Sequence, residues 1–288
     1  MHDITLPQWV KNILRKSLSI REYSSKEIDA LRNKLSRFNN FNPLVSVIIP
    51  AWNEQNGILH TLISLADTTT QYPVELIVVD NNSTDGTALL LHKLGVKCLL
   101  ETKQGVGHAR MKGLLNAKGK YILTGDSDTL YPPSWITAMT NAMLHNETDK
   151  VYCVTGNYSF LPSGQIPRWQ YALYEMMSSI VIKRKRQHEP YLTALGFSCA
   201  FVKDKGIEVD GYNIDTQRTF RGAAGVLESN ATEDGMMALR LIKAGGTIKC
   251  MNSRDTKVWT SDRRIQMDGG LRKAMKMRLD KYLFVNKL

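Results

Sequence analysis

The stretch that decides the fold reads Val45-Ser-Val-Ile-Ile-Pro-Ala-Trp-Asn-Glu54, and it is followed by Glu75-Leu-Ile-Val-Val-Asp-Asn-Asn82. Each segment is a short apolar run, rich in β-branched residues, that ends in a cluster of polar side chains. A continuous apolar run of this length is typical of a strand that is buried on both faces, as the strands of parallel sheets are. The two segments therefore predict buried strands with polar groups at their carboxyl ends.

Outward from these segments, strands alternate with helical patterns. We expect strands at 45–49, 75–79, 96–100 and 121–123, and helices at 57–69, from about 84 onward and at 105–117. This alternation predicts an α/β fold with a Rossmann-like, mostly parallel sheet flanked by helices. Because ligands of such sheets bind beyond the carboxyl ends of the strands, the polar residues at 53–54, 80–81 and 126–128 are expected at one site.

The second half of the chain shows a less regular pattern. We expect a strand within 151–160, a helix at 168–182, a strand within 195–202 and a helix at Glu233–Lys243 that is capped by Thr232. These elements would complete the same domain.

Positive charge is concentrated at the two ends of the chain. The net charge is +11, of which residues 1–42 carry +4, residues 263–288 carry +6 and the stretch between them only +1. A nearly neutral centre argues against a protein whose whole surface binds a polyanion. We therefore expect one domain at 43–262 between a helical basic extension and a basic amphipathic C-terminal helix.

Both basic ends carry apolar stripes at helical spacing. Residues 6–18 and 24–35 read as amphipathic helices, the second opening with a Ser24–Glu27 capping box, and residues 271–283 carry a similar stripe. Amphipathic basic helices can lie on anionic membranes. The alternative is that the same stripes pack on the core or on a partner subunit, and the sequence leaves both readings open.

Cysteine usage and hydropathy favour a cytoplasmic protein. The four cysteines lie far apart without a CxxC pair, so we expect reduced thiols and neither a zinc site nor a disulfide framework. The longest apolar-rich run, 171–182, is shorter than the roughly 20 residues that cross a bilayer. The first residues contain no continuous apolar core of a signal peptide. The expected location is the cytoplasm, with peripheral attachment to the inner face of the membrane as an option.

Two carboxylates two residues apart, Asp126 and Asp128, follow the fourth expected strand. Such a pair on a turn can hold a divalent cation by oxygen ligation, and the cation can neutralise a phosphate leaving group. The alternative is a turn with two solvated aspartates, because the D-x-D pattern is short and common.

In order and spacing, four segments resemble family 2 glycosyltransferases. They are V-S-V-I-I-P-A-W-N-E, E-L-I-V-V-D-N-N-S-T-D-G-T, G-V-G-H-A-R-M-K-G and D-S-D, all within about residues 44–135, and Thr232-Glu233-Asp234-Gly235 resembles the acceptor-side ED motif of that family. The resemblance implies an inverting enzyme of the GT-A fold that moves one sugar from a nucleotide diphosphate donor to an acceptor hydroxyl. It also implies a nucleotide-binding half at 43–130 and an acceptor half at 131–262.

The same resemblance suggests which residues contact the nucleoside of the donor. Pro50, Asn53 and Glu54 would line the nucleoside pocket. Asp80 and Asn81 would contact the base or the ribose. The family more often has a second aspartate at the position of Asn81, so the identity of the base stays open.

Other residues would contact the diphosphate and the metal. By resemblance, Arg110 would approach the base or the diphosphate, Asp126 the ribose or the metal, and Asp128 the metal, expected to be Mn²⁺ or Mg²⁺. Related enzymes often supply a late histidine ligand, whereas all six histidines here lie at or before His188. Arg263 or Arg264 could help neutralise the diphosphate through charge-assisted hydrogen bonds, or form only a solvated basic turn.

The resemblance assigns Asp234 as the general base, beside Glu233. In a single displacement the acceptor hydroxyl loses its proton as it attacks, and a carboxylate within hydrogen-bond reach can take that proton. A helix N-terminus lowers the pKa of a carboxylate, which works against a base. The alternative role of both acids is to stabilise the first turn of the helix at 233–243.

One further match to a family pattern is interpreted as coincidence. Processive members carry Q-x-x-R-W after the ED motif, and Gln165-Ile-Pro-Arg168-Trp169 fits that pattern but precedes Glu233. We therefore expect transfer of a single sugar.

Three rival functions fit the sequence less well. A nucleotidyltransferase of related fold needs a glycine-rich basic loop, which Pro50–Glu54 lacks. A non-catalytic nucleotide- or glycan-binding relative would not need Asp126, Asp128 and Asp234. Nucleic-acid binding is disfavoured by the neutral centre. The expected partners are a nucleotide diphosphate-sugar donor, a glycan or lipid-linked acceptor of surface polysaccharide synthesis and an anionic membrane surface.

Overall fold

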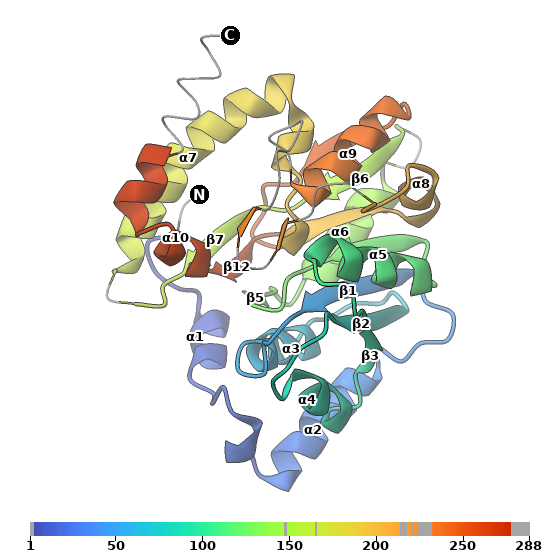
Figure 1. Ribbon diagram of the computed structural model, residues 1–288, viewed down its shortest axis with the longest axis vertical. Helices are drawn as coiled ribbons and strands as arrows, with labels where there is room; N and C mark the ends of the chain where they lie inside the picture. The colour runs from blue at the N-terminus through green and yellow to red at the C-terminus, as the bar shows by residue number, and fades with distance from the viewer. Residues whose placement is uncertain are drawn as a thin grey trace.

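A seven-stranded sheet forms the centre of the computed structural model, which describes residues 3–146, 149–164, 166–213, 218–219, 222–223 and 232–277 (Figure 1). Its strands run in the order β11 (Thr247–Cys250), β6 (Val151–Thr155), β8 (Cys199–Val202), β4 (Tyr121–Thr124), β1 (Val45–Ala51), β2 (Val74–Asp80) and β3 (Lys97–Leu100). Neighbouring strands are parallel except at β8, which is antiparallel to both β4 and β6. The prediction of a mostly parallel α/β sheet is confirmed.

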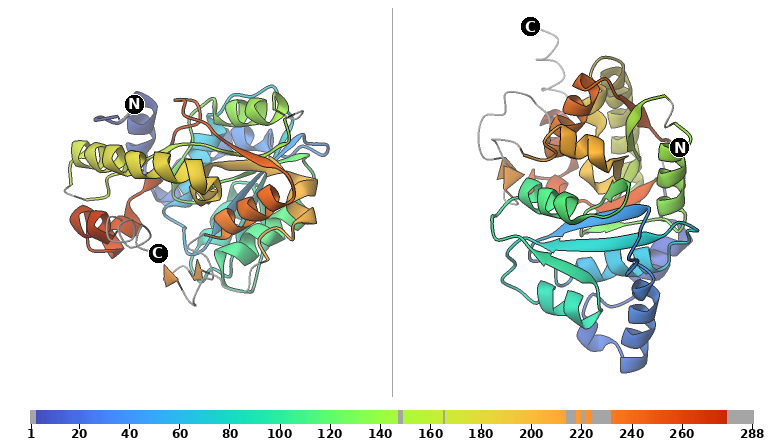
Figure 2. Two further views of the ribbon diagram at one scale, coloured as in Figure 1. Left: turned by 90° about the horizontal axis from the view of Figure 1, so that it is seen from above. Right: turned by 90° about the vertical axis from the view of Figure 1, so that its right-hand side faces the viewer.

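Helices cover both sides of this sheet, as the edge-on view in Figure 2 shows. The helices described are α1 (Gln8–Leu14), α2 (Ser25–Ser36), α3 (Ile58–Ala66), α4 (Thr87–Lys93), α5 (Val106–Asn116), α6 (Trp135–Leu144), α7 (Arg168–His188), α8 (Lys203–Glu208), α9 (Glu233–Lys243) and α10 (Arg263–Met267), with short 3₁₀ turns η1 (Ile20–Glu22), η2 (Pro190–Thr193) and η3 (Gly196–Ser198). The helix at Glu233–Lys243 begins and ends where the sequence predicts, with the Thr232 hydroxyl accepting from the backbone N–H of Gly235 at 3.2 Å.

Strand β1 joins two core layers. Side chains alternate across a strand, so Val47 and Ile49 face one layer and Ile48 faces the other. The first layer includes buried residues of α3 and α6, and the second includes buried residues of α5 and α9. Pro50 does not end the strand, because it stays in register with Val79 and β1 continues to Ala51.

A second sheet of three strands lies beside the main one, in the order β5 (Thr129–Leu130), β12 (Val258–Ser261) and β7 (Tyr158–Leu161). The strand expected within 151–160 is therefore two strands in two sheets. The N–H of Gly156 still donates to Ser198, whereas the carbonyl of Asn157 accepts from Val258 of β12. The hydrogen bonds change sheet between these two residues. A further pair of strands is β9 (Arg218–Thr219) with β10 (Gly222–Ala223).

The N-terminal helices pack their apolar stripes on the domain. Val10 and Ile13 of α1 and Leu31 and Leu35 of α2 are buried in the main core cluster. The predicted capping box is present, since the Ser24 N–H donates to Glu27 at 2.8 Å and the Glu27 N–H donates to the Ser24 hydroxyl at 3.3 Å. Of the two readings of this segment, packing on the core is the one observed.

The C-terminal region begins as two helical stretches. α10 ends before Gly269 and Gly270, which both have positive φ, near +90°, and helical backbone resumes at 271–277. Only glycine adopts this conformation without strain, so the pair breaks what the sequence reads as one helix. Leu271, Ala274 and Met275 pack toward α7, whereas the expected stripe residues Leu279, Tyr282 and Leu283 lie outside the described residues. Among the helices described, none is long and apolar enough to cross a bilayer.

Candidate functional site

The predicted site residues meet at the carboxyl ends of β1, β2 and β4. Ala51 pairs with Asp80 in the register of β1 and β2, and Ile48 pairs with Thr124 of β4, so the loops after the three strands leave the same edge of the sheet. Pro50 lies buried in β1. This position agrees with the ligand-binding edge expected for the fold.

The loops after β1 and β2 are joined by polar contacts. The backbone N–H of Asn53 donates to the Ser83 hydroxyl at 2.9 Å, and the Asn53 side-chain oxygen accepts from the N–H of Thr84 at 2.8 Å. Asp80 accepts from the N–H of Ser83 at 3.2 Å. Asn53 has a φ of 52°, a conformation that asparagine tolerates better than most residues. Asn53 thus shapes the loop that carries Glu54.

Asn81 holds the loop that leads into α5. Its buried amide donates to the carbonyls of Glu101 and Lys103 at 3.0 and 2.8 Å and accepts from the N–H of Gly105 at 2.7 Å. These backbone partners use its amide nitrogen and its oxygen. Contact between Asn81 and a base stays a prediction, while its role in the loop is plain.

Arg263 joins two acidic residues at the open side of the site. It donates to Glu54 at 2.7 Å and to Asp128 at 3.2 Å. Burial raises the pKa of Glu54, and burial together with the neighbouring charge of Asp126 raises the pKa of Asp128. Both carboxylates therefore lie where added positive charge is favourable. Arg264 is exposed and contributes its positive charge near Asp128.

Arg110 joins two further carboxylates deeper in the site. Its guanidinium donates to Asp126 at 2.7 Å and to Asp234 at 2.8 Å, and both Arg110 and Asp234 are buried. The negative charges of Asp234 and Asp126 raise the pKa of Arg110 against the opposing effect of burial. This arginine from α5 therefore connects the turn after β4 with the first turn of α9, which are more than 100 residues apart in sequence.

Asp234 combines burial with an incomplete set of partners. Among the described residues, its Oδ1 has no hydrogen-bond partner, while Oδ2 accepts from Arg110. Burial raises the pKa of Asp234 to about 6, although Arg110 opposes the rise. Glu233 is buried beside it in the same first turn. A carboxylate with this pKa and an unused oxygen can accept a proton near neutral pH.

Two residues that the sequence analysis did not single out shape this site. The Tyr131 hydroxyl accepts from the backbone N–H of Asp126 at 2.8 Å and so holds the turn. Gly196 lies against the Arg110 guanidinium, where a Cβ would come within 2.0 Å of a guanidinium nitrogen. Neither residue lies in a recognisable motif, because their roles arise from segments that meet only in the fold.

The acidic residues fit a cation that is shared with a substrate. Among the described residues, no group of three His, Cys, Asp or Glu side chains gathers as a metal site. Asp126 and Asp128 provide two carboxylates, and the burial of Asp128 and the charge of Asp126 beside it raise the pKa of Asp128. Mg²⁺ and Mn²⁺ commonly take their other oxygen ligands from substrate phosphates and water. The donor set therefore fits a cation that a diphosphate brings with it.

The arginine of the Q-x-x-R-W match, Arg168, is buried inside the protein. Arg168 forms a buried ion pair with Glu175 at 2.7 Å, and its guanidinium lies 5.0 Å from the ring centre of Trp259. Gln165 lies outside the described residues. Arg168 thus anchors the start of α7.

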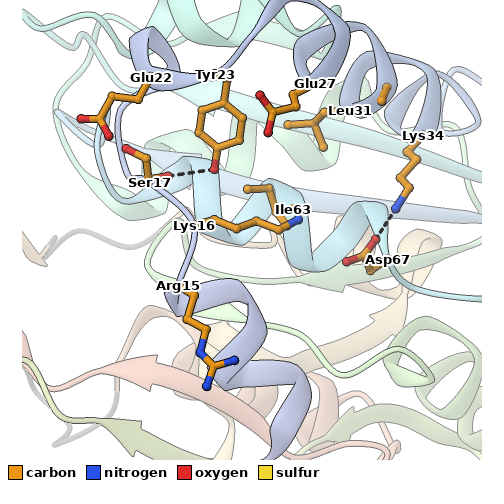
Figure 3. A pocket seen from close by; sticks show the side chains of 11 residues that line it. Arg15, Lys16, Ser17, Glu22, Tyr23, Glu27, Leu31, Lys34, Ile63 and Asp67 are labelled. Carbon is orange, nitrogen blue, oxygen red and sulfur yellow. Dashed lines mark hydrogen bonds and ion pairs between the residues drawn. The ribbon is translucent and has the colours of Figure 1, made fainter.

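A separate cavity of about 450 Å³ lies between the N-terminal extension and α3 (Figure 3). Its polar lining is largely paired internally: Lys34 contacts Asp67 at 2.7 Å, and the Tyr23 hydroxyl donates to the carbonyl of Ser17 at 2.9 Å. It contains none of the predicted site residues, so we place the functional site at the sheet edge.

Comparison with known proteins identifies the family. The model of glycosyl transferase family 2 matches residues 46–203, more than half of the chain. The chain belongs to this family. The matched region contains the predicted donor-side residues from Pro50 to Asp128, and Asp234, Arg263 and Arg264 follow it.

Two curated relatives of this family 2 chain resemble it over 40% of its length. An uncharacterized glycosyltransferase of Rickettsia typhi is 35% identical over 119 residues, which is 40% of this chain and 37% of the relative. The UDP-Glc:alpha-D-GlcNAc-diphosphoundecaprenol beta-1,3-glucosyltransferase WfaP of Escherichia coli is 35% identical over 120 residues, 40% of this chain and 46% of the relative. The matched part thus spans less than half the length of either relative.

A solved structure supports the fold of this family 2 chain. The mannosyltransferase PcManGT from Pyrobaculum calidifontis, in complex with GDP-Man and Mn²⁺, aligns with a TM-score of 0.52 and 19% identity, covering 81% of this chain and 63% of the other. The GT-A architecture predicted from the sequence is confirmed by this likeness.

Proposed function

We propose that this chain transfers one sugar from a nucleotide diphosphate donor to an acceptor hydroxyl with inversion at the anomeric carbon. The observation that carries the proposal is the Arg110 bridge, which joins the D-x-D carboxylate Asp126 to the candidate base Asp234. The bridge brings a diphosphate-binding element and a proton acceptor into one site. Membership of glycosyl transferase family 2 supports the same reading.

The donor would bind across the loops after β1, β2 and β4. Asp80 and the loop shaped by Asn53 would border the nucleoside, and Asp126 and Asp128 would hold Mn²⁺ or Mg²⁺ against the diphosphate. When bound, the cation neutralises charge on the nucleoside diphosphate as it leaves. The structure of the Pyrobaculum mannosyltransferase contains GDP-Man and Mn²⁺, in agreement with this donor class. Arg263 is free to turn from Asp128 toward the diphosphate, because its side chain is more than half exposed.

The chemical step would be a single displacement. The acceptor oxygen forms a bond to the anomeric carbon from the side opposite the diphosphate, and the bond from that carbon to the diphosphate oxygen breaks. Asp234 takes the acceptor proton, and the electron pair of the broken bond leaves with the nucleoside diphosphate. Arg110 keeps the Asp234 carboxylate oriented toward the reacting hydroxyl.

The acceptor class is proposed from the relatives. The E. coli relative is named for an acceptor built on diphosphoundecaprenol, and another relative is a putative teichuronic acid biosynthesis glycosyltransferase of Bacillus subtilis. We propose a lipid-linked glycan or growing surface polysaccharide as the acceptor here, with the enzyme acting at the inner face of the membrane.

A thermal-shift screen of nucleotide diphosphate sugars, with and without Mn²⁺, tests the donor site. We expect one donor to raise the melting temperature, and to do so more strongly with the metal, because a ligand that binds the folded state stabilises it. Asp128→Ala should lose the metal-dependent part of the shift. A shift with nucleoside triphosphates, accompanied by pyrophosphate release, would instead support the rival nucleotidyltransferase.

A second measurement separates an enzyme from a binding protein. Asp234→Asn removes the proton acceptor with little change in shape, so it should keep the donor-induced thermal shift and lose turnover by roughly 100-fold or more. Full turnover in Asp234→Asn would exclude this residue as the base. Donor binding without turnover in the wild type, across lipid-linked and soluble glycan acceptors, would favour the non-catalytic relative.

A further inference from the structure

The outer face of α7 is apolar and exposed. Its exposed large side chains are Trp169, Leu173, Met176, Met177 and Ile180, each between 40% and 58% exposed. Spacings of three and four residues put them on one side of the helix, and we call this set the α7 stripe. α7 lies along the edge of the molecule in both Figure 1 and Figure 2. A contiguous apolar face of this kind marks an interaction surface.

Exposed positive charge lies beside α7. The helical stretch at 271–277 packs toward α7 through Leu271 and Met275, and its Arg272, Lys273 and Lys276 are exposed. The apolar side chains of the α7 stripe are thus combined with basic residues on the neighbouring helical stretch. In the sequence, a basic run at 183–186 also follows Ile180.

We propose that the α7 stripe and the adjoining basic residues form a docking surface for an anionic lipid bilayer. An amphipathic helix of this composition lies in the plane of the membrane interface, with apolar side chains below the head groups and basic ones among the lipid phosphates. A two-fold contact with a second copy would bury the stripe but offer no counter-charge to Arg272, Lys273 and Lys276 in a chain of net charge +11. An anionic lipid surface satisfies both features.

This surface differs from the one that the sequence suggests at the N-terminus. Val10 and Ile13 of α1 and Leu31 and Leu35 of α2 are buried in the core and are not available to lipid. The exposed Ile4, Leu14 and Leu18 do not share a helix, since only Leu14 belongs to α1, whereas the α7 stripe occupies one helical face.

The docking surface also fits the proposed acceptor, and in this respect the inference rests on the proposed function. The inward face of α7 carries Tyr171, whose hydroxyl donates to the buried carboxylate of Asp262. The next residue, Arg263, contacts Glu54 and Asp128 of the site. A bilayer on the outer face of α7 would thus lie one helix away from the donor carboxylates, which suits an acceptor anchored in that bilayer.

Vesicle co-sedimentation tests the surface. Wild-type protein should bind phosphatidylcholine vesicles that contain phosphatidylglycerol and should not bind phosphatidylcholine alone. The double variant Leu173→Gln, Met177→Gln should bind the anionic vesicles at least about tenfold more weakly, because two inserting side chains are lost. The matched control is Leu89→Gln, Leu115→Gln on α4 and α5, since both leucines are more exposed than any residue of the α7 stripe.

Two matched sets of variants test the basic part of the surface. Replacing Arg272, Lys273 and Lys276 by glutamine should weaken binding to anionic vesicles and flatten its salt dependence. Replacing three exposed lysines elsewhere, Lys26, Lys93 and Lys118, removes the same charge and should leave most of the binding. Equal losses in the two sets would overturn a local basic surface in favour of general attraction by net charge.

A spectroscopic readout locates the contact. Trp169 is the only exposed tryptophan of the five, all of which are described, so brominated lipid should quench fluorescence in the wild type and much less in Trp169→Phe. The proposal is overturned if the wild type does not bind anionic vesicles, if the α7 double variant binds them like the wild type, or if the wild type is a dimer that this variant converts to a monomer.

Measuring donor binding alongside vesicle binding separates this test from the test of the proposed function. The α7 double variant should retain the donor-induced thermal shift, because the stripe faces away from the site. Loss of vesicle binding with donor binding intact supports the surface. Vesicle binding in a protein that recognises no nucleotide sugar would leave the surface in place and remove the proposed enzymatic function.

Discussion

At the scale of single residues, Arg110 is the most informative side chain in the molecule. The sequence resemblance suggests that it approaches the base or the diphosphate, whereas the structure shows it buried between Asp126 and Asp234. A buried guanidinium with two carboxylates is a fixed geometric link, because removing either charge leaves the other uncompensated. Gly196 is required by the same link, since no Cβ fits against the guanidinium.

Asp234 gives a prediction for the pH dependence of turnover. Its pKa is raised to about 6, so the carboxyl is protonated below that value and cannot accept the proton of the acceptor. We expect kcat/KM to fall about tenfold per pH unit below about 6 and to level off above it. The pH profile of the wild type measures this limb. A profile that is flat between pH 5 and 7 would contradict the assignment.

Arg110→Met tests the link between the two carboxylates. Methionine has a similar length but carries no charge and donates to neither acid. Because the charge of Arg110 lowers the pKa of Asp234, its loss should move the acid limb of kcat/KM to higher pH, together with a drop of roughly 100-fold in the maximum. Arg168→Met is the matched control: it also disrupts a buried arginine–carboxylate pair, but outside the site, so it should lower the melting temperature without moving the limb.

At the scale of elements, the local signals at helix ends were reliable. The capping box at Ser24–Glu27 and the cap at Thr232 both appear as predicted, because each depends only on residues three apart in sequence. Elements whose hydrogen bonds come from distant segments are predicted less accurately from the sequence. The 151–160 segment divides between two sheets, since Val258 competes for the carbonyl of Asn157.

Ser24→Ala tests the cap of α2. It removes the hydroxyl that accepts from the Glu27 N–H, and we expect a loss of about 1 kcal/mol in the free energy of unfolding. Urea denaturation measures this loss. Ser25→Ala, one position further into the helix, should cost less than about 0.5 kcal/mol, because alanine suits a helical position. Equal effects at the two positions would show that the cap contributes nothing.

At the scale of the whole molecule, the N-terminal extension is part of the domain core. Residues of α1 and α2 belong to the same buried cluster as β1 and α3. The boundary at residue 43 expected from charge is therefore a change in sequence character and not a change in packing. The basic residues of the extension thus lie on helices whose apolar faces pack against the core.

Leu31→Ala tests whether the extension unfolds with the domain. Leu31 is buried against the core, so its truncation should cost about 2–4 kcal/mol and lower the single melting temperature of the whole protein. Leu89→Ala, at an exposed position, should change stability by less than about 0.5 kcal/mol. An early separate transition in Leu31→Ala, with the main melting temperature unchanged, would show instead that α2 unfolds independently.

The sequence by itself determined the mostly parallel sheet, the alternation of its first strands with helices and the edge where the site lies. These depend on local patterns: apolar runs buried on both faces, and polar residues where each strand ends. Only the tertiary structure decided which acidic residue each arginine holds, that Arg110 links Asp126 to Asp234, and that the exposed apolar face belongs to α7 and not to α1 or α2. The physical reason is that burial and ion pairing are properties of segments far apart in the chain, and no local pattern records which segments will meet.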